Sequence, residues 1–287
     1  MPSARADSGS VVAMQALAER DIELVRAENP GPLTLSGTNS YLVGRDPAWL
    51  IDPGPSLPGH IQALLGAIDE RGGLGGIAIT HEHTDHCEAL DELRARTDSP
   101  PLAAASAGAD VKLAEGVRLG PLAALATPGH ADDHFAFLYR DVCFSGDAVL
   151  GEGSVFIAPQ PGALAAYLAT LERLAALEIA LICPGHGEPV TDPQAKLHEY
   201  IAHRKERERM LLAALHAGIR QPAALLDAAW AEVPEALRGA AALSLTAHLH
   251  KLSEEHRLPL DLDPDAPLHA LQPPAHGEAQ RGSRHIA

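Results

Sequence analysis

Short apolar runs of strand length alternate with helical patterns along residues 22–192. Residues 58–71 and 162–177 repeat leucine or isoleucine every three or four positions, which predicts amphipathic helices. Residues 85–96 also have a helical pattern, and residues 101–127 resemble short strands joined by turns. This mixture predicts an α+β domain over residues 1–192. The predicted strands are centred on residues 22–25, 41–43, 49–51, 77–79, 135–139, 142–145 and 179–183.

The pattern changes at Pro193. Three helical stretches follow, at about residues 193–217, 221–230 and 235–256, and residues 258–262 alternate as a short strand would. These features predict a small, mainly helical domain over residues 193–263. From Pro264 the chain is rich in proline, histidine, glycine and polar residues, so residues 264–287 are predicted to be a disordered tail.

Composition limits the classes of protein and of partner. Apolar residues make up 46% of the 287 residues, enough for a sizeable core, and the formal net charge is −16. Such a charge repels polyanions and weighs against a polynucleotide substrate, since phosphate contacts dominate nucleic-acid affinity. A small-molecule substrate is therefore the expected partner, RNA is an alternative, and DNA is disfavoured.

The expected location is the reducing cytoplasm. Three cysteines give no disulfide framework, and residues 1–10 lack the apolar core of a signal peptide. No stretch approaches the roughly 18 apolar residues of a membrane span, so no membrane partner is expected.

A run of metal-ligand side chains follows the predicted strand at residues 77–79. Residues 80–86 read Thr-His-Glu-His-Thr-Asp-His. His81 and His83 are two positions apart, so on an extended backbone they point the same way. Asp85 and His86 fall where the chain turns into a helix and can face two neighbouring points. Imidazole nitrogen and carboxylate oxygen suit Zn²⁺ and related divalent ions, so this run predicts a metal site.

Three later residues offer further ligands. His130, Asp147 and His186 each follow a glycine in a turn or at the end of a predicted strand. Small neighbours allow a side chain to approach a crowded centre. One histidine in a turn is usually just hydrated, but the three residues together with the first run favour a shared metal centre.

These motifs resemble the metallo-β-lactamase superfamily over about residues 20–190. The resemblance implies an αβ/βα four-layer sandwich of two mixed sheets and a metal-dependent hydrolase activity. It also implies that Asp52, in an Ile-Asp-Pro-Gly segment, orients the histidine loop. By the same resemblance, one metal ion is held by His81, His83 and His130, a second by Asp85, His86 and His186, and Asp147 bridges the two.

Three segments point to one branch of that superfamily. Residues 37–44, 127–134 and 144–153 look like the lactamase-like branch that includes a mitochondrial endoribonuclease. Members of that branch carry a C-terminal winged-helix-like unit, to which residues 193–263 would correspond.

The resemblance implies two divalent cations, with Zn²⁺ expected and iron or manganese as alternatives. Two such ions share a water and lower its pKa from 15.7 to about 7. Asp85 is the expected proton acceptor beside that water. His134, four residues beyond His130, either faces the substrate or points to solvent at the start of a strand.

Four functions are compatible with these features. The leading hypothesis is hydrolysis of a small ester, thioester or lactone. A single-strand-specific endoribonuclease is supported by the branch and opposed by the charge. A mononuclear iron persulfide dioxygenase is opposed by the complete second ligand set. The fourth alternative is a DNA-binding regulator that uses residues 193–263.

The basic residues of the C-terminal segment do not favour DNA binding. Arg204, Lys205, Arg207 and Arg209 alternate with Glu206 and Glu208, which allows ion pairs along the helix and predicts a solvated face. A DNA-reading domain is usually clearly basic. We expect this segment to shape the substrate cleft or to pack in a homodimer.

Overall fold

The computed structural model describes residues 8–271, and its strands form two mixed sheets. In the first sheet β1, β2 and β3 are antiparallel, and β3 to β6 are parallel. In the second, β11 is parallel to β10 and the remaining pairs are antiparallel. In sheet order, the first contains β1 (Ile22–Arg26), β2 (Asn39–Val43), β3 (Ala48–Ile51), β4 (Leu74–Ala78), β5 (Leu102–Ala104) and β6 (Val111–Lys112), and the second contains β11 (Leu181–Pro184), β10 (Val142–Gly146), β9 (Phe135–Tyr139), β8 (Leu122–Ala126) and β7 (Arg118–Leu119).

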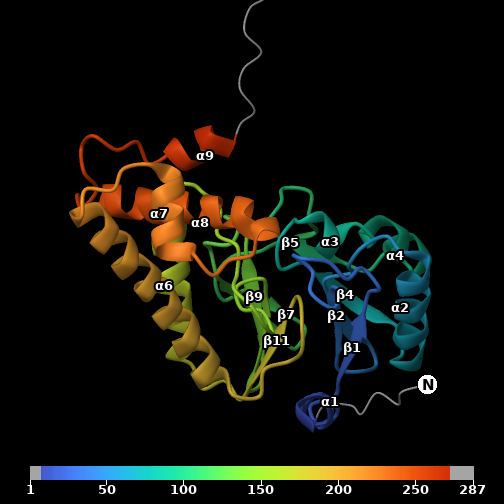
Figure 1. Cartoon of the computed structure of the whole chain (residues 1–287). Coiled ribbons are helices and arrows are strands. Elements are labelled where there is room, and N and C mark those ends of the chain that lie inside the picture. The colour runs from blue at the N-terminus through green and yellow to red at the C-terminus, as the bar shows by residue number, and fades with distance from the viewer. Residues whose placement is uncertain (1–7, 272–287) are drawn as a thin grey trace, which may run out of the picture.

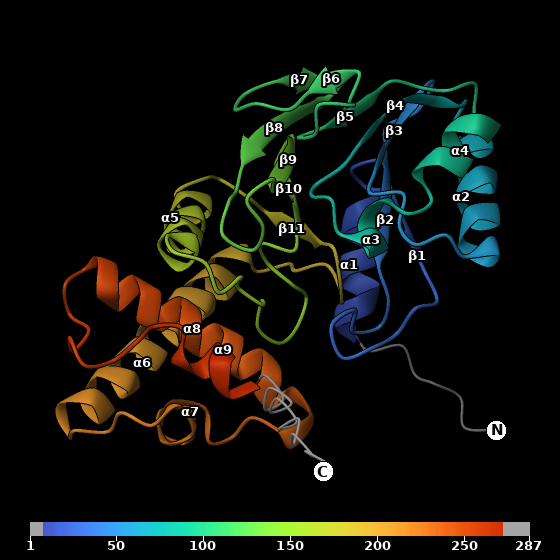
Figure 2. The same cartoon turned by 90° about the horizontal axis from the view of Figure 1, so that it is seen from above.

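Helices cover the outer face of each sheet (Figure 1 and Figure 2). Helices α2 (Pro58–Glu70) and α4 (Leu90–Arg96) pack on the first sheet, and α5 (Ala163–Ala175) and α6 (Pro193–His216) pack on the second. The four layers confirm the predicted αβ/βα sandwich. An N-terminal helix, α1 (Ser8–Ala18), was not predicted.

Side chains on the two faces of each strand fill the spaces between these layers. Tyr41 and Val43 of β2 point between the two sheets, whereas Leu42 points toward α2. The ring of Tyr41 meets Phe144 of β10 edge to face, with ring centroids 5.2 Å apart. The helix-facing layer receives Leu64 and its neighbours from α2. Successive side chains of a buried strand point to opposite faces, so one sheet contributes to two separate apolar layers.

The candidate ligands follow strands that end at one edge of the sandwich. Strands β3 and β4 are parallel, as are β10 and β11, so within each sheet both loops leave at the same edge. Backbone hydrogen bonds tie the two edges together. The N–H of Phe135 donates to the carbonyl of Thr80 at 2.7 Å, and the N–H of Asn39 donates to the carbonyl of Gly185 at 2.8 Å.

The helix predicted at residues 85–96 is divided in two. Helix α3 (Thr84–Cys87) ends before α4 begins at Leu90. Gly54 lies against this break. Its N–H donates to the carbonyl of His86 at 2.9 Å, and its carbonyl accepts from the N–H of Ala89 at 3.0 Å. The break thus fixes the histidine run against the loop that follows β3.

The C-terminal segment is helical, and no strand occurs within its described part, residues 193–271. The strand predicted at 258–262 is wrong. The N–H of Leu262 bonds the carbonyl of Pro259 at 3.1 Å in a turn, and Leu262 packs on the helices. The winged-helix-like architecture is therefore not confirmed. The segment contains α6, α7 (Pro222–Trp230), a 3₁₀ turn (Glu235–Leu237), α8 (Arg238–Glu254) and α9 (Ala266–Leu271).

Helix α9 begins inside the tail that was predicted to be disordered, and residues 272–287 lie outside the described residues. Helix α6 packs on both parts of the chain. Its residues Leu197 and Tyr200 pack with α5, whereas Leu211 packs with α7 and α8. Among the described residues, no helix is long and apolar enough to cross a bilayer.

Candidate metal centre

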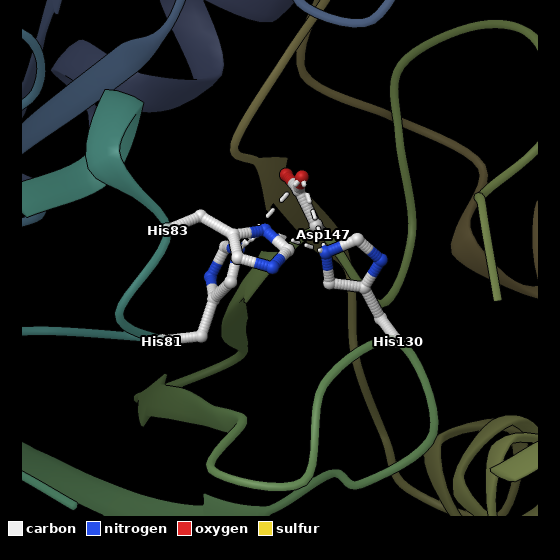
Figure 3. Close-up of side chains that lie close together, drawn as sticks. All are labelled: His81, His83, His130 and Asp147. Atoms are coloured by element: carbon white, nitrogen blue, oxygen red, sulfur yellow. Dashed lines mark hydrogen bonds and ion pairs between the residues drawn. The ribbon is translucent and has the colours of Figure 1, made fainter. Parts of the chain in front are cut away.

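Three histidine rings converge on one point beside Asp147 (Figure 3). Nδ1 of His83 lies 2.9 Å from Nε2 of His81 and 3.2 Å from Nε2 of His130. Oδ2 of Asp147 lies 3.7 Å from Nε2 of His130. These four residues form the first of two candidate metal-binding groups.

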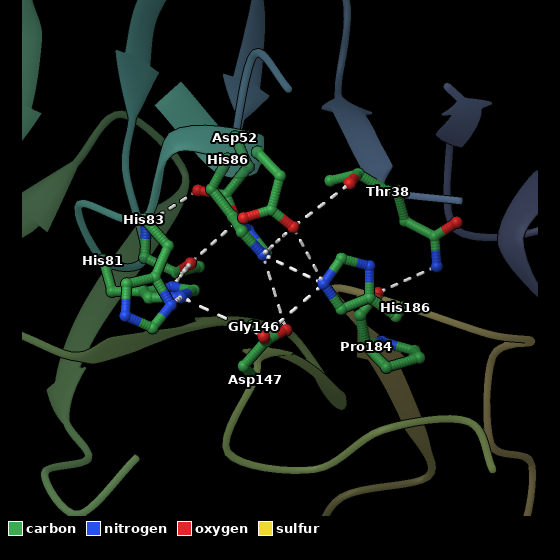
Figure 4. A network of polar contacts seen from close by, with 12 residues as sticks. Thr38, Asp52, His81, His83, His86, Gly146, Asp147, Pro184 and His186 are labelled. Atoms are coloured by element: carbon green, nitrogen blue, oxygen red, sulfur yellow. Dashed lines mark hydrogen bonds and ion pairs between the residues drawn. The ribbon is translucent and has the colours of Figure 1, made fainter. Parts of the chain in front are cut away.

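The second group consists of Asp85, His86 and His186 (Figure 4). Nε2 of His186 lies 3.3 Å from Nε2 of His86 and 3.2 Å from Oδ2 of Asp85. Asp147 contacts this group too, because its Oδ1 lies 3.5 Å from His86 and its Oδ2 lies 3.5 Å from His186. One carboxylate therefore lies between both groups.

The donor geometry fits divalent cations. Donors around a tetrahedral ion with metal–nitrogen distances of about 2.05 Å lie about 3.3 Å from one another. The nitrogen–nitrogen distances of 2.9, 3.2 and 3.3 Å are close to that spacing. Oδ1 of Asp147 is buried and has no hydrogen-bond partner among the described residues. Buried polar atoms are normally paired, so a cation is the missing partner that this arrangement suits.

Four of these histidines turn Nε2 toward the candidate metal groups, and in each of them Nδ1 has a polar partner. Such contacts fix the orientation of a ligating ring. The partners, each on an Nδ1 atom, are the Thr80 hydroxyl for His81 at 3.0 Å, the Phe156 carbonyl for His130 at 2.8 Å, the Asp52 carboxylate for His86 at 2.9 Å and the Gly37 carbonyl for His186 at 3.3 Å.

Asp52 connects the strand ends to the histidine run. Its carboxylate accepts from the backbone N–H and the hydroxyl of Thr80, both at 2.7 Å, and from Nδ1 of His86 at 2.9 Å. Asp52 is buried directly after β3, where its backbone has a positive φ of 52°. One side chain thus fixes both the start of the run and one candidate ligand.

His134 does not face solvent. It is buried, its Nδ1 lies 2.7 Å from the hydroxyl of Thr127, and its Nε2 accepts from the backbone N–H of Asp147 at 3.1 Å. Burial lowers the pKa of His134 to about 3, so the ring is neutral and its Nε2 is free to accept. The solvent-facing alternative for this residue is wrong, and its hydrogen-bond partners are residues that sequence reasoning did not pair with it.

The carboxylates of the centre are ionised. Burial by itself would raise the pKa of Asp147, yet His86 and His186 hold it well below its usual range. The pKa of Asp85 is also lowered, because His186 and His86 outweigh burial. A buried anionic oxygen beside imidazole nitrogens attracts a divalent cation.

Gly185 leaves the space that Asp147 and His86 occupy. A β-carbon at this position would lie 2.5 Å from Oδ1 of Asp147 and 2.6 Å from Cε1 of His86. Both contacts are shorter than real β-carbons show, so any other residue directly before His186 would have to displace Asp147 or His86.

A cavity of about 420 Å³ opens from the centre. His83, Asp85, His130, Asp147 and His186 line one part of it. The C-terminal helices line another part, which agrees with the expectation that this segment shapes the cleft. The apolar lining includes Leu35, Leu150, Val155, Phe156, Trp230 and Val233.

Two arginines of α6 also line the cavity, where a solvated face was predicted. Arg204 is 3% exposed and Arg207 is 8% exposed, whereas Lys205, Glu206 and Arg209 face outward. The alternation of charges correctly indicated surface ion pairs, such as Arg209 with Glu206 at 2.6 Å. It could not reveal that the other face of the helix turns toward the cavity.

Comparison with known proteins agrees with this geometry. A model of the metallo-beta-lactamase superfamily matches residues 104–186, and one of the beta-lactamase superfamily domain matches residues 49–136. The chain is 32% identical to the lactamase-like protein adaB of Aspergillus niger, over 86% of this chain and 85% of that protein. It is 30% identical to the beta-lactamase-like protein 2 homolog of Drosophila melanogaster, over 85% and 92%.

A solved structure shows the same fold. A metallo-beta-lactamase family protein from Thermus thermophilus superposes with a TM-score of 0.62 at 25% identity, over 82% of this chain and 94% of that one. The sequence relatives, the shared fold and the histidine–aspartate cluster agree. This chain belongs to the metallo-β-lactamase superfamily and is a metal-dependent hydrolase.

Proposed function

We propose that the protein is a two-metal hydrolase of a small ester, thioester or lactone. The observation that carries this proposal is the position of Asp147 between two groups of ligand-type side chains at one part of an apolar cavity. One ion would be held by His81, His83 and His130, a second by Asp85, His86 and His186, and Asp147 would contact both.

A pair of divalent ions supplies an activated water and stabilises the negative charge that develops on a carbonyl oxygen. The protein's own residues would hold the ions and accept the proton of that water. Asp85 lines the cavity and its side chain is 32% exposed, so it can reach a water there. Its lowered pKa keeps it ionised and able to accept a proton.

The cavity favours a small acyl substrate. Its volume of about 420 Å³ lies in the range of small-molecule sites, about 300 to 1,000 Å³. Its apolar lining suits an acyl chain or ring. A single-stranded RNA would need a basic groove along its backbone, whereas this chain carries a formal charge of −16. Nitrogen and carboxylate donors suit Zn²⁺, with iron or manganese as the alternatives.

Metal analysis and a substrate panel test the proposal. Elemental analysis of the purified protein should give two ions per chain, and a chelator should abolish activity that Zn²⁺ restores. The metal-loaded protein would then be assayed on thioesters, aryl esters, lactones, a β-lactam, labelled single-stranded RNA and a persulfide. Turnover of an acyl substrate is expected. Cleavage of RNA alone, or persulfide oxidation with one iron, would replace the proposal with the corresponding alternative.

A further inference from the structure

Arg204 is a buried cation without an anionic partner among residues 8–271. Its side chain is 3% exposed, and its Nη2 donates to the carbonyl of Val155 and to the hydroxyl of Ser154, the latter at 3.2 Å. The guanidinium also lies 5.5 Å from the centroid of the Tyr167 ring. No carboxylate of residues 8–271 forms an ion pair with it.

The neighbouring arginine shows what Arg204 lacks. Arg207, one turn further along α6, is also buried and pairs with Glu232 and with the carbonyl of Ala229. A buried charge is unfavourable unless it is paired. Burial lowers the pKa of Arg204, which is the sign of an uncompensated charge. The carbonyl of Val155 and the hydroxyl of Ser154 accept hydrogen bonds from one nitrogen of Arg204, but neither group neutralises its positive charge.

The location of Arg204 indicates where a partner would come from. Arg204 lines the same cavity as the candidate metal centre, together with Arg207 and His203 of α6. Among the described residues that line this cavity, Glu152 is the only carboxylate outside the metal centre, and it is exposed. Among the described residues of this part of the cavity, Arg204 is therefore a positive charge without a paired carboxylate, in a chain whose formal charge is −16.

We propose that Arg204 binds an anionic group, a carboxylate or a phosphate, on the substrate that is cleaved at the metal centre. The hydroxyl of Ser154 lies beside it, 3.2 Å from its Nη2. A guanidinium binds either oxyanion through paired N–H donors. This inference rests on the proposed hydrolase function and narrows it to substrates with an apolar body, a scissile acyl bond and an acidic group.

Matched thioesters test this inference. The glutaryl and pentanoyl thioesters of N-acetylcysteamine have similar length, but only the first ends in a carboxylate. We expect the wild-type protein to hydrolyse the glutaryl thioester with the higher kcat/KM. Arg204→Gln should lower that preference by about tenfold or more, and Arg204→Lys should keep part of it. Arg209→Gln is the matched control, because Arg209 is exposed on the same helix and pairs with Glu206.

The outcomes separate the possibilities. If Arg204 only supports the backbone at Val155 and the side chain of Ser154, Arg204→Gln slows the hydrolysis of both thioesters equally and the inference is wrong. A wild-type protein that prefers the pentanoyl thioester contradicts it as well, even if Arg204→Gln does not fold. Inhibition by glutarate or by inorganic phosphate, weaker in Arg204→Gln at equal metal content, shows which anion is preferred.

Failure of the hydrolase proposal would look different. In that case neither thioester is hydrolysed by the metal-loaded protein. Calorimetric titration with glutarate and with inorganic phosphate then still tests the subsite. Binding that weakens by about tenfold in Arg204→Gln but not in Arg209→Gln supports it. Equal binding by all three proteins, or none, overturns it.

Discussion

Nε2 of His134 lies 3.1 Å from the backbone nitrogen of Asp147 and accepts its hydrogen bond. The opposite ring nitrogen lies 2.7 Å from the hydroxyl of Thr127. This neutral ring therefore fixes the backbone of Asp147, whose carboxylate contacts both candidate metal-binding groups. His134 itself belongs to neither group.

Replacing His134 by phenylalanine should destabilise the centre. The variant keeps a ring but leaves the N–H of Asp147 without its buried acceptor, which costs about 1–3 kcal/mol. We expect a lower midpoint of urea unfolding and weaker metal retention during dialysis. His198→Phe, on the exposed face of α6, is the control. Unchanged metal retention in His134→Phe would show that the bond to Asp147 does not support the centre.

Asp147→Ala should reduce the metal content. The substitution removes the carboxylate that lies within 3.5–4.0 Å of histidines in both groups. Elemental analysis is expected to show the loss of at least one ion per chain, together with the loss of hydrolytic activity. Asp132→Ala removes an exposed carboxylate near His130 and serves as the control. The assignment of Asp147 between two ions fails if both ions remain.

Gly185→Ala should disturb the centre without unfolding the sheets. The added methyl group would lie 2.5 Å from Oδ1 of Asp147 and displace it. Metal content and activity are expected to fall while far-ultraviolet circular dichroism stays unchanged. Gly66→Ala on α2 is a matched control, because nothing lies within 4 Å of the added carbon. In a helix this control change stabilises by about 0.5–1 kcal/mol.

His248 should make the fold sensitive to acid. It is buried in α8 against Trp230, neither ring nitrogen has a hydrogen-bond partner among the described residues, and burial holds its pKa well below the usual range. Arg204, Lys251, His203 and Arg207 lower it further.

Below a pH of about 6.5, His248 therefore binds a proton in the unfolded chain but stays neutral in the folded chain. The free energy of unfolding then falls by up to about 1.4 kcal/mol per pH unit. His248→Phe should remove this part of the acid sensitivity. The free energy of unfolding would be measured by urea titration at pH 7 and pH 5 for both proteins. An equal loss in both would show that other groups cause it.

Most strands and helices were predictable, because the strands are short apolar runs and the helices repeat apolar residues every three or four positions, whereas the arrangement in two sheets was expected only from the resemblance to the superfamily. Helix α1 was missed because Val11, Val12 and Met14 are exposed, so its apolar positions do not mark one buried face. The alternation at residues 258–262 predicted a strand, but no partner strand lies beside it among the described residues and Pro259 starts a turn. Local pattern cannot decide whether a pairing partner is available.

The candidate ligands were predictable because the histidine run and three glycine-flanked residues carry a chemical signature in the sequence. The supporting residues carry none. The role of His134 depends on a hydrogen bond to Asp147, and that of Gly185 on a close approach to two side chains. Arg204 looked like part of a solvated stretch, because only the folded chain shows that α6 borders the cavity.

The candidate ligands are divided between the two halves of the sandwich. Residues 81–86 follow the first sheet, whereas His130, Asp147 and His186 come from loops of the second. Neither half holds a complete set, so a metal ion can bind tightly only after the halves have docked. Bound ions would then act as non-covalent cross-links that slow the separation of the sheets. The rate of unfolding, and with it resistance to proteolysis, would depend on the availability of metal.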